Sequence, residues 1–312
     1  MPDAGGATAI GVDIGGTNLR VARVSGAGDV LEGRSEAVAR DPLELLNRIV
    51  ELCRSLDTPG VAGIGLGVPG RVDSADRRVL SGGVVDLSGV ALAEVVEARL
   101  GKPVVVDNDC SLALVAERAV GAAQGTKDVV MFTIGTGIGG AVVLGGRVAH
   151  GRRTAGQLGH LTVDPSGLRC ACGRRGCVET TSSGTALRRL MADAGLPDTT
   201  LAQALFDLEA AGDARATRVL DAWAAPLRSA IDSIVAALDP ELVVLGGGLG
   251  GFAVRALGRA PALSPWYECA VVGARLGDEA GAIGAGLAAL AAALPARPAA
   301  PVLAPASMGL PG

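Results

Sequence analysis

The stretch AIGVDIGGTNLRVARV, residues 9–24, decides the fold. Its two apolar runs flank a Gly-Gly pair, a pattern typical of two strands joined by a tight turn. A second stretch of the same design, DVVMFTIGTGIGGAVVLGGRVA, occupies residues 128–149. In both, a hydrophobic strand enters a Gly/Thr turn and the chain leaves as another strand. This internal repeat predicts two related domains, each of which offers a glycine turn to a shared cleft.

Strands and helices alternate around these two hairpins. Apolar runs bounded by turn residues predict buried strands at 61–70, 103–109 and 241–250. Periodic apolar positions predict helices at 42–56, 90–100, 110–120 and 280–294. The alternation predicts an α/β protein in which helices cover the faces of sheets.

Composition excludes several classes of protein. The chain has 312 residues, a formal net charge of −4 and only two Trp, one Tyr and three Phe, and it lacks a block of Lys or Arg. Nucleic-acid binding needs a basic surface or aromatic stacking platforms, so we expect no nucleic-acid partner. The longest uncharged apolar stretch, 280–295, is shorter than the ~20 residues of a membrane span, and no secretory signal opens the chain. We therefore expect a soluble cytoplasmic protein with no membrane partner.

Three glycine turns follow predicted strands and fit phosphate binding. Glycines let backbone N–H groups approach an anionic oxygen, a Thr hydroxyl adds a donor, and a strand-end Asp holds Mg²⁺ through water. The residues are Asp13, Gly15, Gly16 and Thr17 in the first turn, Gly135, Thr136 and Gly137 in the second, and Gly247 and Gly248 in the third. Each turn alone also fits an ordinary hairpin. None matches a P-loop or a dinucleotide fingerprint, so the three together favour nucleotide phosphates in an interdomain cleft.

Asp107-Asn108-Asp109 ends a predicted buried strand, where a side chain reaches the cleft from a fixed backbone. In phosphoryl transfer an Asp accepts the proton of the attacking hydroxyl. Asp109 equally fits the N-cap of the helix predicted at 110–120. The residues alone leave both roles open.

A tight group of metal-ligand types lies between residues 160 and 177. Cys170, Cys172 and Cys177 follow His160, and three thiolates with one imidazole form a closed tetrahedral set, as in structural Zn²⁺ sites. The set leaves no position for water, so the sequence predicts a metal that braces a loop and does not catalyse; free thiols are the alternative. His150 has no partner in the sequence, and we expect it to be a surface or hairpin residue.

These motifs occur in the order seen in the ROK family of sugar kinases, which the chain resembles from about residue 9 to 290. The matching elements are DIGGTN, the VPG turn, DND, IGTGIGG, GQLGH, CACGRRGCVE, VVLGGGLG and GDEAGAIGAGLAAL. The resemblance implies a duplicated actin/hexokinase-like (ribonuclease H-like) fold with two α/β domains around a central cleft. It implies a smaller domain at 1–110, completed by the C-terminal helix at about 278–294, and a larger domain at 111–277 that carries the zinc-binding loop. The Pro/Ala-rich segment 295–312 is expected to be a disordered tail.

The resemblance also implies a role for each matching residue, with ATP, Mg²⁺ and structural Zn²⁺ as cofactors. Asp109 would be the catalytic base. ATP and its phosphates would be bound by Asp13, Gly15, Gly16, Thr17, Asn18, Gly135, Thr136, Gly137, Gly247 and Gly248. The sugar would be bound by Gly70, Asn108, Asp109, Gln157, His160 and Glu179, and the metal by His160, Cys170, Cys172 and Cys177. His160 would serve twice, with one ring nitrogen on zinc and the other on the sugar.

Two positions depart from the family pattern. Gln157 stands where a sugar-binding Glu is usual, and a neutral acceptor binds a hydroxyl more weakly, by roughly 1 kcal/mol, than a carboxylate does. The segment after the VPG turn lacks the usual Asn, with Val84 or Val85 near its position. The first hypothesis is therefore an ATP-dependent kinase of the primary hydroxyl of a hexose such as glucose. The second keeps the chemistry and takes a sugar-like cyclitol or another modified sugar.

Other functions are disfavoured. The family includes sugar-responsive DNA-binding repressors, but only 12 residues precede Asp13, too few for a helix-turn-helix domain. A catalytically inactive sugar sensor is opposed by the presence of Asp109. A polyphosphate donor is disfavoured because the chain has only two lysines, Lys102 and Lys127. The resemblance implies a homodimer or homotetramer whose partners are ATP and a small-molecule acceptor.

Overall fold

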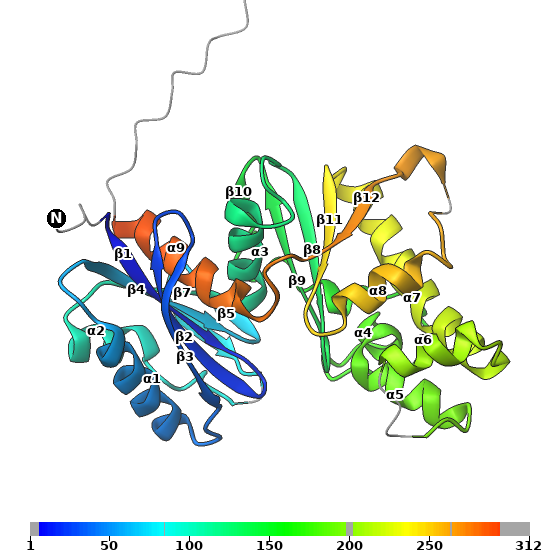
Figure 1. Ribbon diagram of the computed structural model, residues 1–312, viewed down its shortest axis with the longest axis horizontal. Helices are drawn as coiled ribbons and strands as arrows, with labels where there is room; N and C mark the ends of the chain where they lie inside the picture. The colour runs from blue at the N-terminus through cyan, green and yellow to red at the C-terminus, as the bar shows by residue number, and fades with distance from the viewer. Residues whose placement is uncertain (1–5, 84, 198–201, 263, 294–312) are drawn as a thin grey trace, which may run out of the picture.

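Two five-stranded sheets with the same strand order form the frame of the protein (Figure 1). The structure is a computed structural model that describes residues 6–83, 85–197, 202–262 and 264–293. The first sheet runs β3 (Val30–Ala37), β2 (Asn18–Ser25), β1 (Thr8–Ile14), β4 (Val61–Val68) and β7 (Val104–Asn108). The second runs β10 (Arg147–Val148), β9 (Ile138–Leu144), β8 (Val129–Ile134), β11 (Leu242–Gly246) and β12 (Ala270–Gly273).

The pairing within the two sheets is also the same. In each sheet the first strand in sequence, β1 or β8, lies in the middle. The two strands on one side of it each run antiparallel to their inner neighbour, and the two on the other side each run parallel to theirs. The predicted hairpins are confirmed: β1 and β2 flank the turn at 15–17, and β8 and β9 flank the turn at 135–137. The duplicated α/β fold expected from the repeat is therefore present.

Helices cover the outer faces of both sheets. On the first sheet these are α1 (Pro42–Leu56) and α2 (Leu92–Leu100), and a small sheet of β5 (Arg71–Asp73) and β6 (Arg78–Ser81) adjoins β7. The second lobe contains α4 (Glu179–Ser182), α5 (Gly184–Asp193), α6 (Ala202–Ala210), α7 (Ala214–Leu238), α8 (Gly250–Leu257), η1 (Leu158–His160) and η2 (Pro265–Tyr267). We call the first sheet with its helices the N-lobe and the second sheet with its helices the C-lobe.

Two helices lie between the sheets, α3 (Asp109–Val120) and α9 (Ala280–Ala293). The chain leaves the N-lobe through α3 and returns from β12 through η3 (Gly277–Glu279) into α9, the orange helix of Figure 1. A buried cluster joins both helices to β2 and to the second sheet. The two crossings of the chain between the lobes are thus packed side by side. The expected tail at 295–312 lies outside the described residues.

α9 is rich in glycine and alanine because it lies almost against the strands beneath it. A Cβ atom on Gly11 of β1 would lie 1.8 Å from the carbonyl oxygen of Ala282, and one on Gly65 of β4 would lie 2.0 Å from that of Ala285. Side chains larger than hydrogen would push the helix away from the sheet. The close packing fixes the end of β1, where Asp13 lies, relative to the start of α9.

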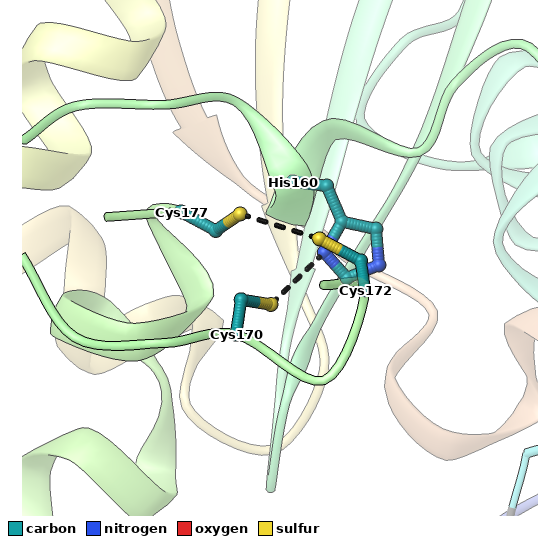
Figure 2. Close-up of side chains that lie close together, drawn as sticks. All are labelled: His160, Cys170, Cys172 and Cys177. Atoms are coloured by element: carbon teal, nitrogen blue, oxygen red, sulfur yellow. Dashed lines mark hydrogen bonds between the residues drawn. The ribbon is translucent and has the colours of Figure 1, made fainter. Parts of the chain in front are cut away.

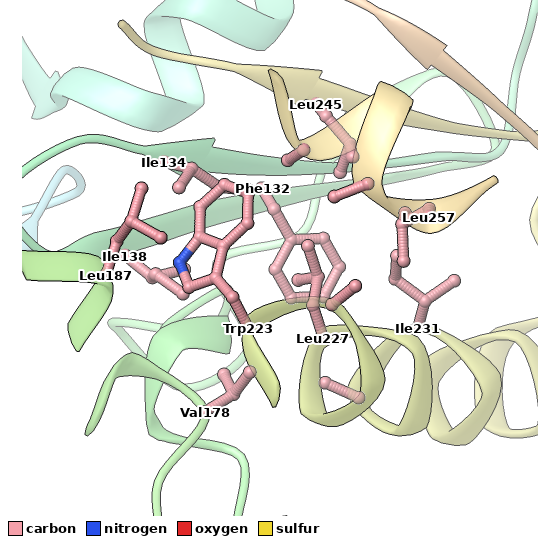
Figure 3. Packing of buried hydrophobic residues seen from close by; sticks show 14 of the residues in the cluster. Phe132, Ile134, Ile138, Val178, Leu187, Trp223, Leu227, Ile231, Leu245 and Leu257 are labelled. Carbon is pink, nitrogen blue, oxygen red and sulfur yellow. The ribbon is translucent and has the colours of Figure 1, made fainter. Parts of the chain in front are cut away.

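A core under the second sheet anchors the hairpin of β8 and β9. Phe132, Ile134 and Ile138 pack with Trp223 of α7 and Leu187 of α5 (Figure 3). The indole nitrogen of Trp223 donates to the carbonyl oxygen of Ser183 at 3.0 Å, so this large side chain leaves no polar atom unpaired. The turn at 135–137 therefore projects from a rigid base. No helix among the described residues has the length and apolarity required to cross a membrane.

Candidate functional site

The end of β1, the start of α3 and the turn after β11 meet around one cavity between the lobes. The cavity has a volume of about 160 Å³. Its lining includes Asp13, Arg20, Asp109, Thr133, Gly247, Asp278 and Gly281. The structure thus brings together the carboxylates of Asp13 and Asp109 and the third glycine turn, whereas the hairpin turns at 15–17 and 135–137 do not contribute to the lining of this cavity.

Asp109 is the first residue of α3 and is held rigidly at the cavity. Its Oδ1 accepts from the backbone N–H of Cys110 at 2.9 Å and from Nδ2 of Asn108 at 2.8 Å. The helix cap is Asn108, whose Oδ1 accepts from the backbone N–H of Cys110 at 3.0 Å and of Ser111 at 3.3 Å. The interpretation of Asp109 as the cap is therefore wrong, because the asparagine before it performs that role. Desolvation raises the pKa of the Asp109 carboxyl, which favours proton uptake.

Asp13 faces the same cavity from the end of β1. Burial, followed by the nearby charge of Asp109, raises the pKa of Asp13 from 3.8 to about 7. The Arg20 guanidinium opposes this effect, with Nη1 3.9 Å from Oδ2 of Asp13. Two carboxyl groups shielded from water on the wall of one cavity form a site that favours a bound cation or proton uptake.

Of the three glycine turns, the third contributes Gly247 to the lining of this cavity. Gly247 has a φ of +76°, and a Cβ atom there would lie 2.6 Å from the carbonyl oxygen of Ile134, so the third turn is pressed against the end of β8. In the first turn the N–H of Gly15 donates to the carbonyl oxygen of Asn18. Thr136 and Gly137 line a neighbouring cavity of about 340 Å³. Gly135, Gly16, Thr17 and Gly248 belong to the same turns.

Two of the residues expected to bind the acceptor, Asn108 and Gln157, meet at the carbonyl oxygen of a third, Gly70, which follows β4. Nδ2 of Asn108 donates to it at 3.0 Å and Nε2 of Gln157 at 3.4 Å. The Gln157 contact joins the C-lobe to the N-lobe across the cleft. Val85, one of two positions considered for the missing asparagine, is buried in the N-lobe core, and Val84 lies outside the described residues.

Glu179, the sixth expected acceptor residue, already has a backbone partner. Its Oε2 accepts from the N–H of Ile138 at 2.9 Å, and it lines the same cavity as Thr136 and Gly137. A Cβ atom on Gly137 would lie 2.5 Å from this oxygen. The glutamate therefore fixes the second glycine turn, and its other oxygen, Oε1, accepts from Sγ of Cys170 at 3.9 Å.

The predicted metal ligands form one cluster (Figure 2). The ligand atoms of His160, Cys170, Cys172 and Cys177 all lie within 4.8 Å of one another. Nδ1 of His160 is 3.6 Å from Sγ of Cys170, and Sγ of Cys172 is 3.6 Å from Sγ of Cys177. A backbone hydrogen bond from Arg174 is the main cause that lowers the pKa of the Cys172 thiol to about 7. Spacing and donor set both fit one tetrahedral Zn²⁺.

Charged contacts that the motifs did not predict cross the cleft beside Gly70. Nε2 of His150 lies 2.8 Å from Oδ2 of Asp107, and this hydrogen bond raises the pKa of the imidazole. Nε of Arg153 lies 3.0 Å from Oδ2 of the buried Asp73. His150 follows the hairpin of β9 and β10, as expected, and the fold gives it a partner that the sequence did not indicate, Asp107 at the end of β7. The sequence signal for these contacts was the run of His150, Arg152 and Arg153 just before GQLGH. Their acidic partners, Asp73 and Asp107, lie at the ends of β5 and β7.

Comparisons with known proteins agree with this arrangement. The profile of the ROK family matches residues 9–293. A glucokinase from Thermotoga maritima is 34% identical over 258 residues, covering 77% of this chain and 81% of that protein. An N-acetylmannosamine kinase from Yersinia pestis is 32% identical over 289 residues, covering 89% of this chain and 97% of that protein.

A solved structure extends the likeness to three dimensions. The ROK family glucokinase from Streptomyces griseus, in complex with glucose and AMPPNP, superimposes with a TM-score of 0.77 at 30% identity, covering 91% of this chain and 99% of that one. The family match, the identities and the shared fold lead to one conclusion. This chain belongs to the ROK family.

Proposed function

We propose that the protein is an ATP-dependent sugar kinase that phosphorylates the primary hydroxyl of a hexose such as glucose. The observation that carries the proposal is the cavity in which Asp109, with a raised pKa, faces Asp13 and the glycine turn at Gly247. Relatives named glucokinase and N-acetylmannosamine kinase support the same reaction class. ATP supplies the phosphoryl group, and a nucleotide-bound Mg²⁺ would screen its charge beside Asp13.

Asp109 acts as the general base in this proposal. The acceptor hydroxyl gives its proton to Asp109 while its oxygen attacks the terminal phosphorus, and the bond to the bridging oxygen breaks to release ADP. Asn108 restrains the carboxyl group through the hydrogen bond from Nδ2, so the base does not rotate away. Backbone N–H groups of the turns at Gly15, Gly135 and Gly247 stabilise the charge on the phosphate oxygens. Thr17, Asn18, Thr136 and Gly248 are assigned to the same nucleotide site.

The cluster of His160 with three cysteines holds a structural Zn²⁺ in this account. The metal would brace the loop that joins η1 to α4, because Cys177 lies two residues before Glu179. Glu179 and the second ring nitrogen of His160 would then contact acceptor hydroxyls. The metal supplies no chemistry to the transfer, since all four of its positions are taken by protein ligands.

Gln157 supports an alternative acceptor. Its amide donates to the carbonyl oxygen of Gly70, whereas a carboxylate there would accept from an acceptor hydroxyl. The alternative is a sugar-like cyclitol or another modified sugar with a primary hydroxyl, bound where the missing carboxylate is not required. Gly70, Asn108 and Gln157 would contact this end of either acceptor.

A panel of acceptors tests the proposal. ADP release is measured with ATP and Mg²⁺ against glucose, other hexoses, N-acetylhexosamines and cyclitols. Turnover that saturates with one acceptor in the micromolar to millimolar range supports a sugar kinase and names the substrate. Strong glucose turnover refutes the cyclitol version, and ADP release that is independent of every acceptor refutes the kinase.

The domain division and assembly are part of the same proposal. The packing of α9 on β1 and β4 supports an N-terminal domain of 1–110 completed by the C-terminal helix, with 111–277 as the larger domain. The protein is proposed to work as a homodimer or homotetramer in the cytoplasm, which size-exclusion chromatography with light scattering and cell fractionation would test.

A further inference from the structure

Arg20 is the one positively charged side chain on the wall of the cavity shared by Asp13 and Asp109, among the residues that the structure describes there. The same wall carries three acidic side chains, Asp13, Asp109 and Asp278. A nucleotide adds several more negative charges. A site of this composition needs protein cations as well as Mg²⁺, and the glycine motifs contribute only neutral N–H groups.

The guanidinium of Arg20 is positioned by the strand register. Arg20 on β2 lies directly opposite Asp13 on β1 in the antiparallel ladder, so both side chains leave the same face of the sheet. Nη1 lies 3.9 Å from Oδ2 of Asp13 and 3.8 Å from the point that a Cβ atom on Gly15 would occupy. The cation therefore sits over the first glycine turn, where the sequence predicts phosphate.

The second partner of Arg20 is easily exchanged. Nη2 donates to Oδ2 of Asp278 at 2.6 Å, but the Asp278 side chain is 78% exposed. Ion pairs with an exposed partner contribute little, because water competes for both charges. A phosphate oxygen that enters the cavity can take the place of the Asp278 carboxylate and form a charge-assisted hydrogen bond with the same N–H group.

We propose that Arg20 binds an oxygen of the terminal phosphate of the nucleotide and stabilises the charge that develops there during transfer. This inference rests on the proposed kinase function and adds a catalytic residue to it. As the acceptor oxygen bonds to phosphorus and the bond to the bridging oxygen breaks, the electron pair of that bond passes to ADP and the hydroxyl proton to Asp109. Arg20 keeps its own proton and compensates the phosphoryl charge, as guanidinium groups do in other phosphoryl transfers.

The alternative is a purely structural tether, in which Arg20 only joins β2 to η3 through Asp278. Three variants separate the two. Arg20→Met removes the cation, Arg20→Lys keeps a charge without the planar guanidinium, and Asp278→Asn removes the charge of the tether but leaves the guanidinium. Arg34→Met is the matched control, because Arg34 lies on the adjacent strand β3, outside the lining of this cavity, and its guanidinium donates to Glu32 and to the carbonyl oxygen of Gly33.

The measurements are kcat, KM for ATP, melting temperature and, by calorimetry, the affinity for a non-hydrolysable ATP analogue with Mg²⁺. We expect Arg20→Met to lower kcat by about 100-fold or more, the scale of a lost charged transition-state contact, and to weaken analogue binding. We expect Arg20→Lys to recover part of the rate, Asp278→Asn to lose less than tenfold, and the control to match the wild type. Comparable losses in Arg20→Met and Asp278→Asn, or an Arg20→Met rate near wild type, would overturn the proposal.

The analogue titration keeps this inference separate from the reaction itself. Absence of turnover by the wild type with every acceptor would count against the proposed function. In that case weaker analogue binding by Arg20→Met would still support a phosphate contact, and unchanged binding would refute it. Arg20→Lys with a wild-type melting temperature guards against a loss of activity through misfolding.

Discussion

Replacing Asp13 by Asn is expected to stabilise the ligand-free protein while it removes activity. The carboxyl group is forced into a shielded position beside Asp109, and its pKa rises from 3.8 to about 7. A group whose pKa is higher in the folded state favours folding only while it is protonated. Its contribution to stability is present below pH 3.8 and is lost as the pH rises through about 7.

The size of the effect follows from the shift. One pKa unit corresponds to about 1.4 kcal/mol, so the Asp13 carboxyl lowers the unfolding free energy, relative to a neutral isostere, by roughly 4 kcal/mol at pH 8, about 3 kcal/mol at pH 6 and under ~1 kcal/mol at pH 4. Asn is isosteric with the protonated carboxyl and carries no charge. The difference in unfolding free energy between variant and wild type should therefore grow with pH and level off above about 7.

Urea denaturation at several pH values from 4 to 8, with neither nucleotide nor Mg²⁺ added, measures this difference. Taking the difference in unfolding free energy between variant and wild type at each pH cancels, to first order, the contributions of the other titratable acids. An Asn variant that is no more stable than wild type at pH 8, or whose advantage is the same at pH 4, would refute the argument that Asp13 is held at an electrostatic cost.

Three further outcomes are expected. Gly65→Ala should destabilise the protein by about 2 kcal/mol or more in urea denaturation, because the new methyl group would lie 2.0 Å from the carbonyl oxygen of Ala285; an unchanged midpoint would show that α9 is not so closely packed. The stability advantage of wild type over His150→Gln should be largest below pH 6.5 and disappear as the pH rises through the elevated pKa of the imidazole, since the hydrogen bond to Asp107 favours the protonated form; a difference that is constant from pH 6 to 9 would argue against this pair. Removal of zinc with a strong chelator should lower the melting temperature of wild type and have little effect on Cys172→Ser, with metal content checked by mass spectrometry; a wild-type protein without bound zinc would contradict the metal assignment.

Much of the fold could be predicted because hydrophobic pattern and turn chemistry act locally. The hairpins at 9–24 and 128–149 carry their own strands and glycine turns, and the buried strands at 61–70 and 241–250 end in turn residues. Their repetition was enough to infer a duplicated fold. Local pattern also brought His160 and the three cysteines into one group, since their spacing alone limits how far apart the chain can place them.

The charged contacts could not be predicted because they depend on which strand ends meet. Asp107 and His150 are 43 residues apart in sequence and lie in different lobes, so only the assembled fold makes them neighbours. Arg20 resembles any polar residue of an alternating strand until the register places it opposite Asp13. The role of Asp109 was open for a similar reason: Asn108 and Asp109 both suit a helix start, and the backbone geometry decides which one caps.

The most direct test of the account is the turnover of Asp109→Asn with ATP and the best acceptor. We expect a fall in kcat of about 1000-fold, the scale of a lost general base, with a melting temperature at or above that of wild type because Asn108 provides the helix cap. Binding of the nucleotide analogue should stay within a few-fold of wild type. A variant that turns over within tenfold of the wild-type rate would contradict the claim that this carboxylate accepts the proton of the acceptor.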